Sequence, residues 1–278
     1  MTDRPHHRPG PGERYDSFAR LHRGDRPLLL PNAWDHASGA ALAARGFAAI
    51  GTTSLGVAAA AGLPDGSGAT REETLMLGRG LARLPALVSV DIEGGFGGGP
   101  EDVGELAADL LHAGVAGINI EDGRPDGSLA PLDRQCEVIG AVKERAPELF
   151  VNARTDTHWV TLGSPSGPLP GTVERAEAYQ RAGADGVFVP GVSDAGEIRA
   201  LVGALDVPLN VLFTPGGRSF AELAGLGVRR VSCGSLLYRA ALHHAVELAW
   251  GIAHPGTPGA AVPGYAETAA LADAFTDT

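Results

Sequence analysis

His112-Ala113-Gly114-Val115-Ala116-Gly117-Ile118-Asn119-Ile120 carries the pattern that decides the fold. An amphipathic helix over Glu101–Ala113 is expected to end at Gly114, because glycine suits a helix C-cap. A short apolar strand, Ala116–Ile120, follows directly. The same passage from helix through glycine to strand recurs around three further glycines: Gly46, Gly183 and Gly227.

Working outward from this unit, short aliphatic segments of the kind found in strands buried on both faces recur along the chain. Strands are expected at Pro27–Leu30, Ala48–Gly51, Leu87–Val90, Ala116–Ile120, Leu149–Val151, Gly186–Val189, Leu209–Leu212 and Arg229–Ser232. Helices are expected at His36–Arg45, Arg71–Arg83, Glu101–Ala113, Leu132–Arg145, Val173–Ala182, Ala195–Ala204, Ser219–Gly225 and Leu236–Trp250. Eight strands alternating with eight helices in about 250 residues predict a (β/α)₈ TIM barrel. A doubly wound open sheet is the alternative, but its G-x-G-x-x-G fingerprint does not fit the glycine cluster here.

The domain organisation follows from the absence of an internal linker. Residues 20–252 are predicted to form one barrel domain. Residues 1–19 begin polar and Pro/His-rich and are predicted to be a flexible lead-in. Residues 253–278 form a tail that is Pro/Gly-rich and then helical over Tyr265–Phe275, and that could pack on a neighbouring subunit or fray.

Composition narrows the class of protein. The 278 residues carry a net charge of −11, so no basic field exists to bind nucleic acid. No stretch approaches the roughly 20 apolar residues that span a bilayer, so no membrane partner is expected. The two cysteines, Cys136 and Cys233, are far apart and lack metal-binding spacing, which indicates a reducing cytoplasm.

The segment Asp91-Ile92-Glu93-Gly94-Gly95-Phe96-Gly97 follows the predicted strand Leu87–Val90. In an extended chain, carboxylates two residues apart lie on the same side. Two like charges repel unless a cation separates them, and a hard divalent ion such as Mg²⁺ is the simplest candidate. A solvated strand end with surface acids is the alternative.

A barrel would gather further polar residues, because chemistry belongs at the carboxyl ends of its strands. Asp91, Glu93, Glu121 and Arg154 follow neighbouring strands and are expected to converge. The planar fork of Arg154 suits a carboxylate or phosphate, which indicates a small anionic substrate; a structural ion pair of Arg154 with Glu121 is the alternative. His158 and Trp159 could line the pocket or form a packed rim.

Five motifs then carry a resemblance: Pro31-Asn32-Ala33-Trp34-Asp35, Thr53-Ser54-Leu55-Gly56, Asp91-Ile92-Glu93-Gly94-Gly95-Phe96-Gly97, Ile118-Asn119-Ile120-Glu121-Asp122 and Asn152-Ala153-Arg154-Thr155-Asp156. In this order they resemble the isocitrate lyase/phosphoenolpyruvate mutase superfamily. The resemblance implies a (β/α)₈ barrel, usually tetrameric and often with the last helix swapped between subunits. It also implies Mg²⁺, or Mn²⁺ in its place, and small 2-oxo or 2-hydroxy acid substrates.

The resemblance also assigns roles to residues. Asp91 would contact the metal directly, and Glu93 and Glu121 would act mainly through metal-bound waters. Arg154 would hold the substrate carboxylate, with Thr53, Ser54 and Leu55 presenting donors to substrate oxygens. Asp65 matches the aspartate of a gating loop and is the candidate base, although Pro64-Asp65-Gly66 also suits an exposed turn. Asn152 and Asn210 complete the expected substrate-binding set.

Departures from the superfamily leave the reaction open. The Lys-Lys-Cys-Gly-His segment of isocitrate and methylisocitrate lyases and the Lys-Thr-Asn-Ser stretch of phosphoenolpyruvate mutases are both missing. The leading hypothesis is a Mg²⁺-dependent C–C lyase for a small 2-hydroxy or 2-oxo carboxylate, acting through an enolate-like intermediate. A phosphoenolpyruvate mutase-like or phosphonopyruvate-cleaving enzyme and a non-catalytic barrel scaffold are the alternatives. A homo-oligomer, either a dimer or a tetramer, is expected.

Overall fold

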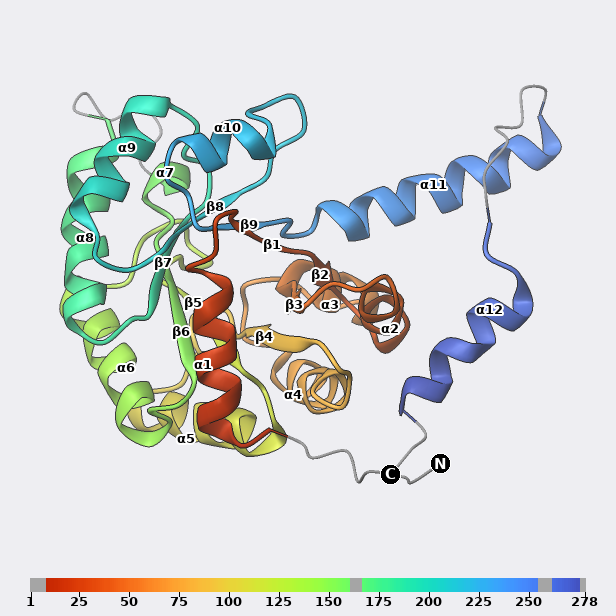
Figure 1. Cartoon of the computed structure of the whole chain (residues 1–278), viewed down its shortest axis with the longest axis horizontal. Helices are drawn as coiled ribbons and strands as arrows, with labels where there is room; N and C mark the ends of the chain where they lie inside the picture. Colours follow the sequence, from red (N-terminus) through yellow and green to blue (C-terminus); the bar gives the residue numbers. More distant parts are fainter. Residues whose placement is uncertain (1–8, 161–166, 255–261, 276–278) are drawn as a thin grey trace.

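The computed structural model describes residues 9–160, 167–254 and 262–275, and its centre is a parallel barrel (Figure 1). The strands are β1 (Leu28–Leu30), β2 (Asn32–Ala33), β3 (Ala49–Thr52), β4 (Leu87–Asp91), β5 (Gly117–Glu121), β6 (Phe150–Arg154), β7 (Gly186–Val189), β8 (Leu209–Leu212) and β9 (Arg230–Ser232). Their order is β1-β9-β8-β7-β6-β5-β4-β3-β2, and every pairing is parallel. The predicted (β/α)₈ barrel is confirmed.

Nine strands form an eight-stranded barrel because the first strand is divided at Pro31. β1 pairs with β9, whereas β2 pairs with β3. Proline has no N–H to donate to the ladder, so a break there is expected. Asn32 bridges the break: its Nδ2 donates to the Thr52 carbonyl at 2.7 Å, and its Oδ1 accepts from the Cys233 amide at 3.0 Å. A side chain therefore completes the seam where the barrel closes.

Helices surround the barrel: α2 (His36–Ala44), α3 (Ser54–Ala61), α4 (Arg71–Leu81), α5 (Pro100–Ala113), α6 (Leu132–Arg145), α7 (Thr157–Val160), α8 (Leu169–Arg181), α9 (Ala195–Ala204) and α10 (Phe220–Gly225). A further helix, α11 (Leu236–Ala253), follows β9. The short helices α3 and α7 were not predicted. The four glycines of the repeated signature all have positive φ, as left-handed helix ends require: Gly46, Gly114, Gly183 and Gly227.

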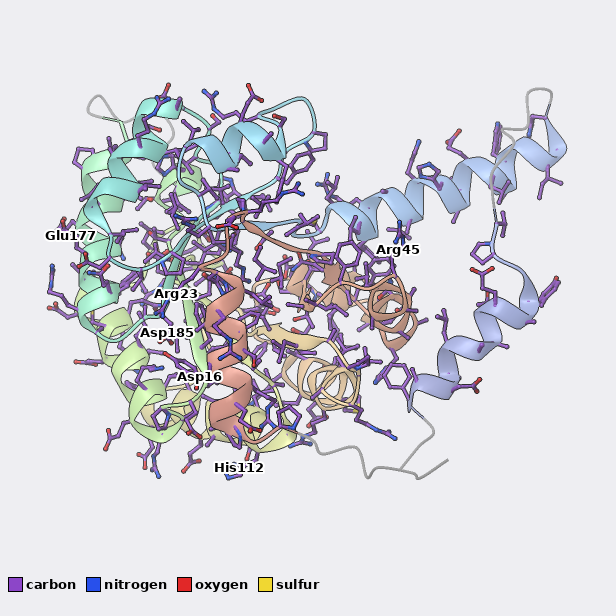
Figure 2. The ribbon with its side chains drawn as sticks, in the orientation of Figure 1. Asp16, Arg23, Arg45, His112, Glu177 and Asp185 are labelled. Atoms are coloured by element: carbon purple, nitrogen blue, oxygen red, sulfur yellow. The ribbon has the colours of Figure 1, made fainter. Side chains whose placement is uncertain are left out.

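The beginning of the chain differs from the predicted flexible lead-in over residues 1–19. Residues 1–8 lie outside the described part, but Pro11–Leu21 form helix α1 across the amino ends of the strands. Pro11 opens the helix, and Phe18 is fully buried against the ring of Phe150. The Tyr15 hydroxyl donates to Asp185, which lies beside α1 in Figure 2, at 2.6 Å. The apolar side chains of Tyr15, Phe18 and Ala19 therefore hold helix α1 against the barrel.

The carboxyl-terminal region leaves the barrel. Helix α11 extends away from it in Figure 1, and the chain returns through α12 (Tyr265–Ala269) and the 3₁₀ helix η1 (Ala270–Phe275). Phe275 packs edge-on against His36 of α2. Within the described ranges, no helix is long and apolar enough to cross a membrane.

Candidate active site

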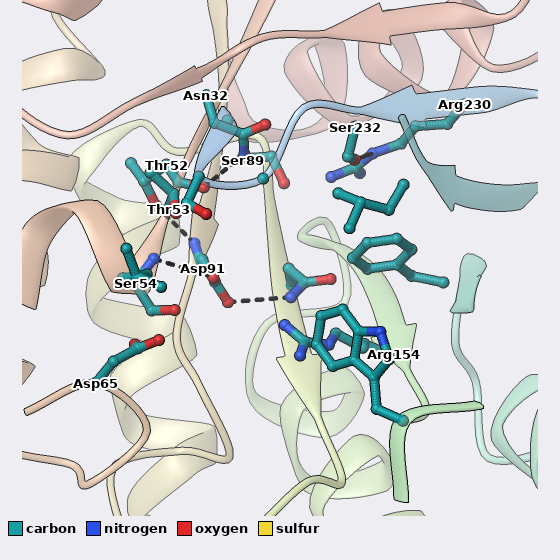
Figure 3. A pocket seen from close by; sticks show the side chains of 18 residues that line it. Asn32, Thr52, Thr53, Ser54, Asp65, Ser89, Asp91, Arg154, Arg230 and Ser232 are labelled. Atoms are coloured by element: carbon teal, nitrogen blue, oxygen red, sulfur yellow. Dashed lines mark hydrogen bonds between the residues drawn. The ribbon is translucent and has the colours of Figure 1, made fainter. Parts of the chain in front are cut away.

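A cavity of about 180 Å³ opens at the carboxyl ends of the strands (Figure 3). Asp65, Ser54 and Asp91 lie on one side of it, and Arg154 and Arg230 lie on the other. Ser89, Asn119 and Trp159 also contribute to its wall. Since one water molecule occupies about 30 Å³ of liquid, this space suits a small ligand.

Asp91 is held rigidly at the end of β4. Its amide donates to the Thr52 hydroxyl at 2.8 Å. One carboxylate oxygen accepts from the Ser54 amide at 3.2 Å, and the other accepts from Asn119 Nδ2 at 3.0 Å. Asn152 Nδ2 in turn donates to Asn119 Oδ1 at 3.0 Å. The carboxylate is thus preorganised by neutral donors, with no cation paired to it in the described chain.

Arg154, in contrast, is paired with two acids. Asp156 binds it in a bidentate fashion, at 2.6 Å from Nε and 2.9 Å from Nη2. Nη1 forms an ion pair with Glu121, and the Trp159 ring lies 4.7 Å from the guanidinium carbon. Burial alone would lower the pKa of Arg154, but Glu121 and Asp156 together raise it above its ordinary value. The guanidinium is therefore permanently charged and firmly oriented.

Glu121 and Asp65 both sit where a negative charge is disfavoured. Burial raises the pKa of Glu121 to about 8; Arg154 opposes this shift and Asp91 adds to it. Burial likewise raises the pKa of Asp65, which a hydrogen bond from the Ser54 side chain partly offsets. Burial is the largest cause of both shifts, and the nearby carboxylate of Asp91 adds to each of them.

The sequence predicted that Glu93 and Asp91 lie on the same side of the chain, but in the structure they do not. The strand ends at Asp91, and Glu93 takes a left-handed φ of 51°, so the alternation of an extended chain no longer applies. Its Oε2 accepts from the Gly68 amide at 2.9 Å and its Oε1 accepts from the Thr70 hydroxyl at 2.8 Å. Glu93 therefore anchors the loop of residues 62–70, which carries Asp65 over the cavity.

The expected substrate-binding residues divide into two groups. Thr53, Ser54 and Leu55 line the cavity, but the Thr53 amide donates to the Ala33 carbonyl and the Ser54 amide to Asp91. The Leu55 amide lies in the first turn of α3, where amides lack a partner within the helix. Asn152 and Asn210 lie beneath the cavity wall instead, bonded to Asn119 and to Ser232. These two asparagines support wall residues because their side chains point into the barrel interior below the ligand space.

The carboxylates expected to hold a metal are not gathered into one cluster. In residues 9–160, 167–254 and 262–275, no three His, Cys, Asp or Glu side chains come together as a metal-binding group. Glu93 is turned to its loop and Glu121 to Arg154. Asp91 alone faces the cavity with its outer lone pairs. A single carboxylate fits Mg²⁺, which keeps several waters and is often bound through one or two carboxylates.

Sequence reasoning missed Asn119, Ser89 and Arg230. Each is a polar residue within a strand of otherwise buried apolar residues, and each points to the barrel interior. That alternation was the available signal. Trp159 does line the cavity, whereas His158 turns away toward Thr172 and Glu197 at 3.3 Å from each.

The fold and the site define a (β/α)₈ barrel with an acidic, arginine-lined cavity at the carboxyl ends of its strands. The family model for phosphoenolpyruvate phosphomutase matches residues 18–253, and the chain belongs to this family, within the isocitrate lyase/phosphoenolpyruvate mutase superfamily of lyases and mutases.

Individual relatives agree with this placement. The chain is 43% identical over 251 residues to an uncharacterized protein of Mycobacterium tuberculosis strain H37Rv, covering 90% of this chain and 94% of that protein. It is 32% identical over 219 residues to 2-methylisocitrate lyase of Halalkalibacterium halodurans, covering 76% and 71%. A crystal structure of a candidate lyase/mutase from Burkholderia cenocepacia J2315 superposes with a TM-score of 0.83 at 35% identity, covering 94% of this chain and 96% of that one.

Proposed function

We propose that the protein is a Mg²⁺-dependent lyase that cleaves a C–C bond beside the carboxylate of a small 2-hydroxy or 2-oxo acid. The observation that carries this proposal is Asp91, a carboxylate fixed by Ser54 and Asn119 in the wall of a small cavity. Its relatives, 2-methylisocitrate lyase among them, add support for the reaction class. Mn²⁺ could replace Mg²⁺ at such an oxygen site.

The metal would be held directly by Asp91, and Glu121 and Glu93 would act through bound waters. When bound, the ion supplies Lewis-acid stabilisation of charge on the substrate oxygens. Arg154, oriented by Asp156 and Glu121, provides fixed positive charge for the carboxylate of the substrate. The first turn of α3, at Leu55, adds a backbone donor.

Asp65 is the base in this proposal. Burial raises the pKa of Asp65, which makes it a stronger base, and Asp65 lines the cavity. For a 2-hydroxy acid, Asp65 accepts the hydroxyl proton as the C2–O bond becomes a carbonyl. The C2–C3 bond breaks, and its electron pair passes to the departing fragment as an enolate that is later protonated.

A phosphonopyruvate-cleaving or mutase-like reaction is the second candidate. It is favoured by the description of the matching family as phosphoenolpyruvate phosphomutase. Phosphorus NMR with phosphonopyruvate distinguishes it, because release of phosphate or rearrangement to a phosphate ester shifts the signal.

We also propose a homo-oligomer and a cytoplasmic location. Large apolar side chains on the protruding helix α11 support association with a second copy: Leu242, Val246, Trp250 and Ile252 are all exposed. A dimer or a tetramer would cover them.

A proton NMR screen tests the reaction. The protein with Mg²⁺ is mixed with small 2-hydroxy and 2-oxo mono- and diacids, and a cleavage fragment such as pyruvate, glyoxylate or oxalate is expected. EDTA should stop the reaction. Asp91→Ala should lower kcat by at least about a hundredfold, because it removes the direct ligand of the ion.

The matched control is Asp16→Ala, an exposed aspartate on α1 that should keep full activity. Full activity of Asp91→Ala would refute the role of Asp91. Silence of the wild-type protein across the panel, without Mg²⁺ binding, would instead favour a non-catalytic scaffold.

A further inference from the structure

Arg230 is a buried cation whose charge the rest of the site does not explain. It lies on the inner face of β9 with 3% of its surface exposed, and it lines the cavity. Its Nε donates to the Ser232 hydroxyl at 3.3 Å, a long bond. Its Nη1 is buried and has no hydrogen-bond partner in the described chain.

The surroundings of Arg230 leave its charge uncompensated. Burial lowers its pKa to about 9, and Asp91 is the acid that acts in the opposite direction. On the other side lies His22, whose pKa burial lowers to about 3, with Arg230 adding to the shift, so the imidazole is neutral at pH 7. A buried guanidinium without a hydrogen-bonded counter-ion costs stability. Such a group is retained where a ligand supplies the missing charge.

The two arginines of the cavity differ in this respect. Arg154 has already satisfied its fork with Asp156 and Glu121. Arg230 lines the same cavity, and its Nη1 is buried without a hydrogen-bond partner in the described chain. Ser89, from β4, also lines the cavity, and its Oγ is likewise buried without a partner. Two residues that line the cavity from different strands therefore each carry a buried polar atom without a partner.

We infer that Arg230, assisted by Ser89, binds a second anionic group of the substrate and so selects dianionic acids over monoanionic ones. This inference rests on the proposed function, because it assumes that the first carboxylate binds near Asp91 and Arg154. The second group would be a carboxylate in a C–C lyase and a phosphoryl or phosphonyl group in the alternative reaction. In either case Arg230 is a specificity-determining residue.

The test compares two acids that differ by one carboxylate. Lactate and malate are both 2-hydroxy acids, and their dissociation constants with Mg²⁺ are measured by ligand-observed NMR titration. The wild-type protein should bind malate about tenfold to a hundredfold more tightly than lactate, the range of a charge-assisted hydrogen bond. Arg230→Met should remove this preference and leave lactate affinity unchanged, and Ser89→Ala should reduce the preference in part.

Two controls separate recognition from structure. Arg229→Met changes the neighbouring exposed arginine, which bonds to the Gly24 carbonyl, and should behave as wild type. Arg230→Met should melt at the same temperature as wild type or higher, because it removes a buried unpaired charge; Arg230→Lys should restore part of the preference.

The outcomes are distinct. Malate preference that survives in Arg230→Met and Ser89→Ala, or that is absent from the wild type, overturns the inference, while Mg²⁺-dependent lactate binding still supports the proposed function. Failure of both acids to bind the wild type overturns both. An Arg230→Met variant that unfolds, together with an Arg230→Lys variant that folds but shows no preference, would indicate a structural arginine and also overturn the inference.

Discussion

At the scale of single residues, two carboxylates and two guanidinium groups line the cavity, and they differ in their partners. Asp91 accepts hydrogen bonds from Ser54 and Asn119, whereas Arg154 forms ion pairs with Asp156 and Glu121. The uncommitted carboxylate is therefore Asp91, and the uncommitted cation is Arg230. A metal ion and an anionic ligand would each neutralise one of them, which explains why this interior can carry unpaired charge.

His22 gives a residue-scale prediction about pH. Burial lowers its folded pKa to about 3, while the unfolded value is 6.5. Above pH 6.5 both states are neutral and stability is complete; below it the unfolded chain takes up the proton and stability falls. Between pH 7 and pH 5 this linkage should cost about 2 kcal/mol of unfolding free energy.

Urea unfolding at both pH values measures this effect. His22→Phe, which keeps the stacking on Phe150, should lose this contribution to the pH dependence. His112→Gln, at an exposed position, should retain it. An unchanged pH dependence in His22→Phe would show that other groups cause the acid sensitivity.

The sequence predicted the position of candidate residues that directly follow a strand. It did not predict the position of residues that depend on loop contacts. Asp91 and Arg154 lie at the cavity because parallel strands end at one edge, whereas Asp65 was expected there only from the family resemblance. Glu93 could not be placed, since its left-handed backbone depends on loop contacts with Gly68 and Thr70. Arg230 was missed because β9 has only three residues, so its alternation of polar and apolar side chains is a short signal.

At the scale of elements, the loop of residues 62–70 depends on Glu93. Glu93→Ala would leave the buried Thr70 hydroxyl and the Gly68 amide without their acceptor. We expect a loss of about 2 to 4 kcal/mol in unfolding free energy without any metal present, since each unsatisfied buried group costs about 1–3 kcal/mol.

Urea denaturation in EDTA provides the measurement, with Glu105→Ala on the exposed face of α5 as the control. If the Glu93→Ala variant is as stable as wild type, Glu93 does not stabilise the loop of residues 62–70. Only the proposed role of Glu93 toward the metal, through bound waters, would then remain.

Element prediction from the sequence succeeded for eight of the nine described strands, because each of these is a short aliphatic segment preceded by a helix. It failed for β2, because pairing of Asn32 and Ala33 with β3 is set by closure of the barrel and not by propensity. Helix α1 was also missed, since its apolar stripe is short and follows a polar, proline-rich beginning.

At the scale of the whole molecule, α11 is the feature that a single chain does not explain. Val246 and Trp250 each expose 63% of their surface on a helix that leaves the barrel. Introducing Val246→Glu together with Trp250→Glu should convert the proposed oligomer to monomers, because charge in an apolar interface is strongly unfavourable.

Size-exclusion chromatography with light scattering measures the mass. His243→Glu, an exposed substitution on the same helix, is the comparison that tests whether added charge alone has this effect. A wild-type protein that is monomeric in this measurement would contradict the proposed oligomer.

The pairing of β1 with β9 affects how the barrel can fold during synthesis on the ribosome. Leu28 pairs with Arg230, so a ribosome working at about 5–20 residues per second releases β1 roughly 10 to 40 s before its partner. During that interval the growing sheet has open edges that can pair with other chains. Stalled or truncated products that end before β9 should therefore be the form of this protein most prone to aggregate.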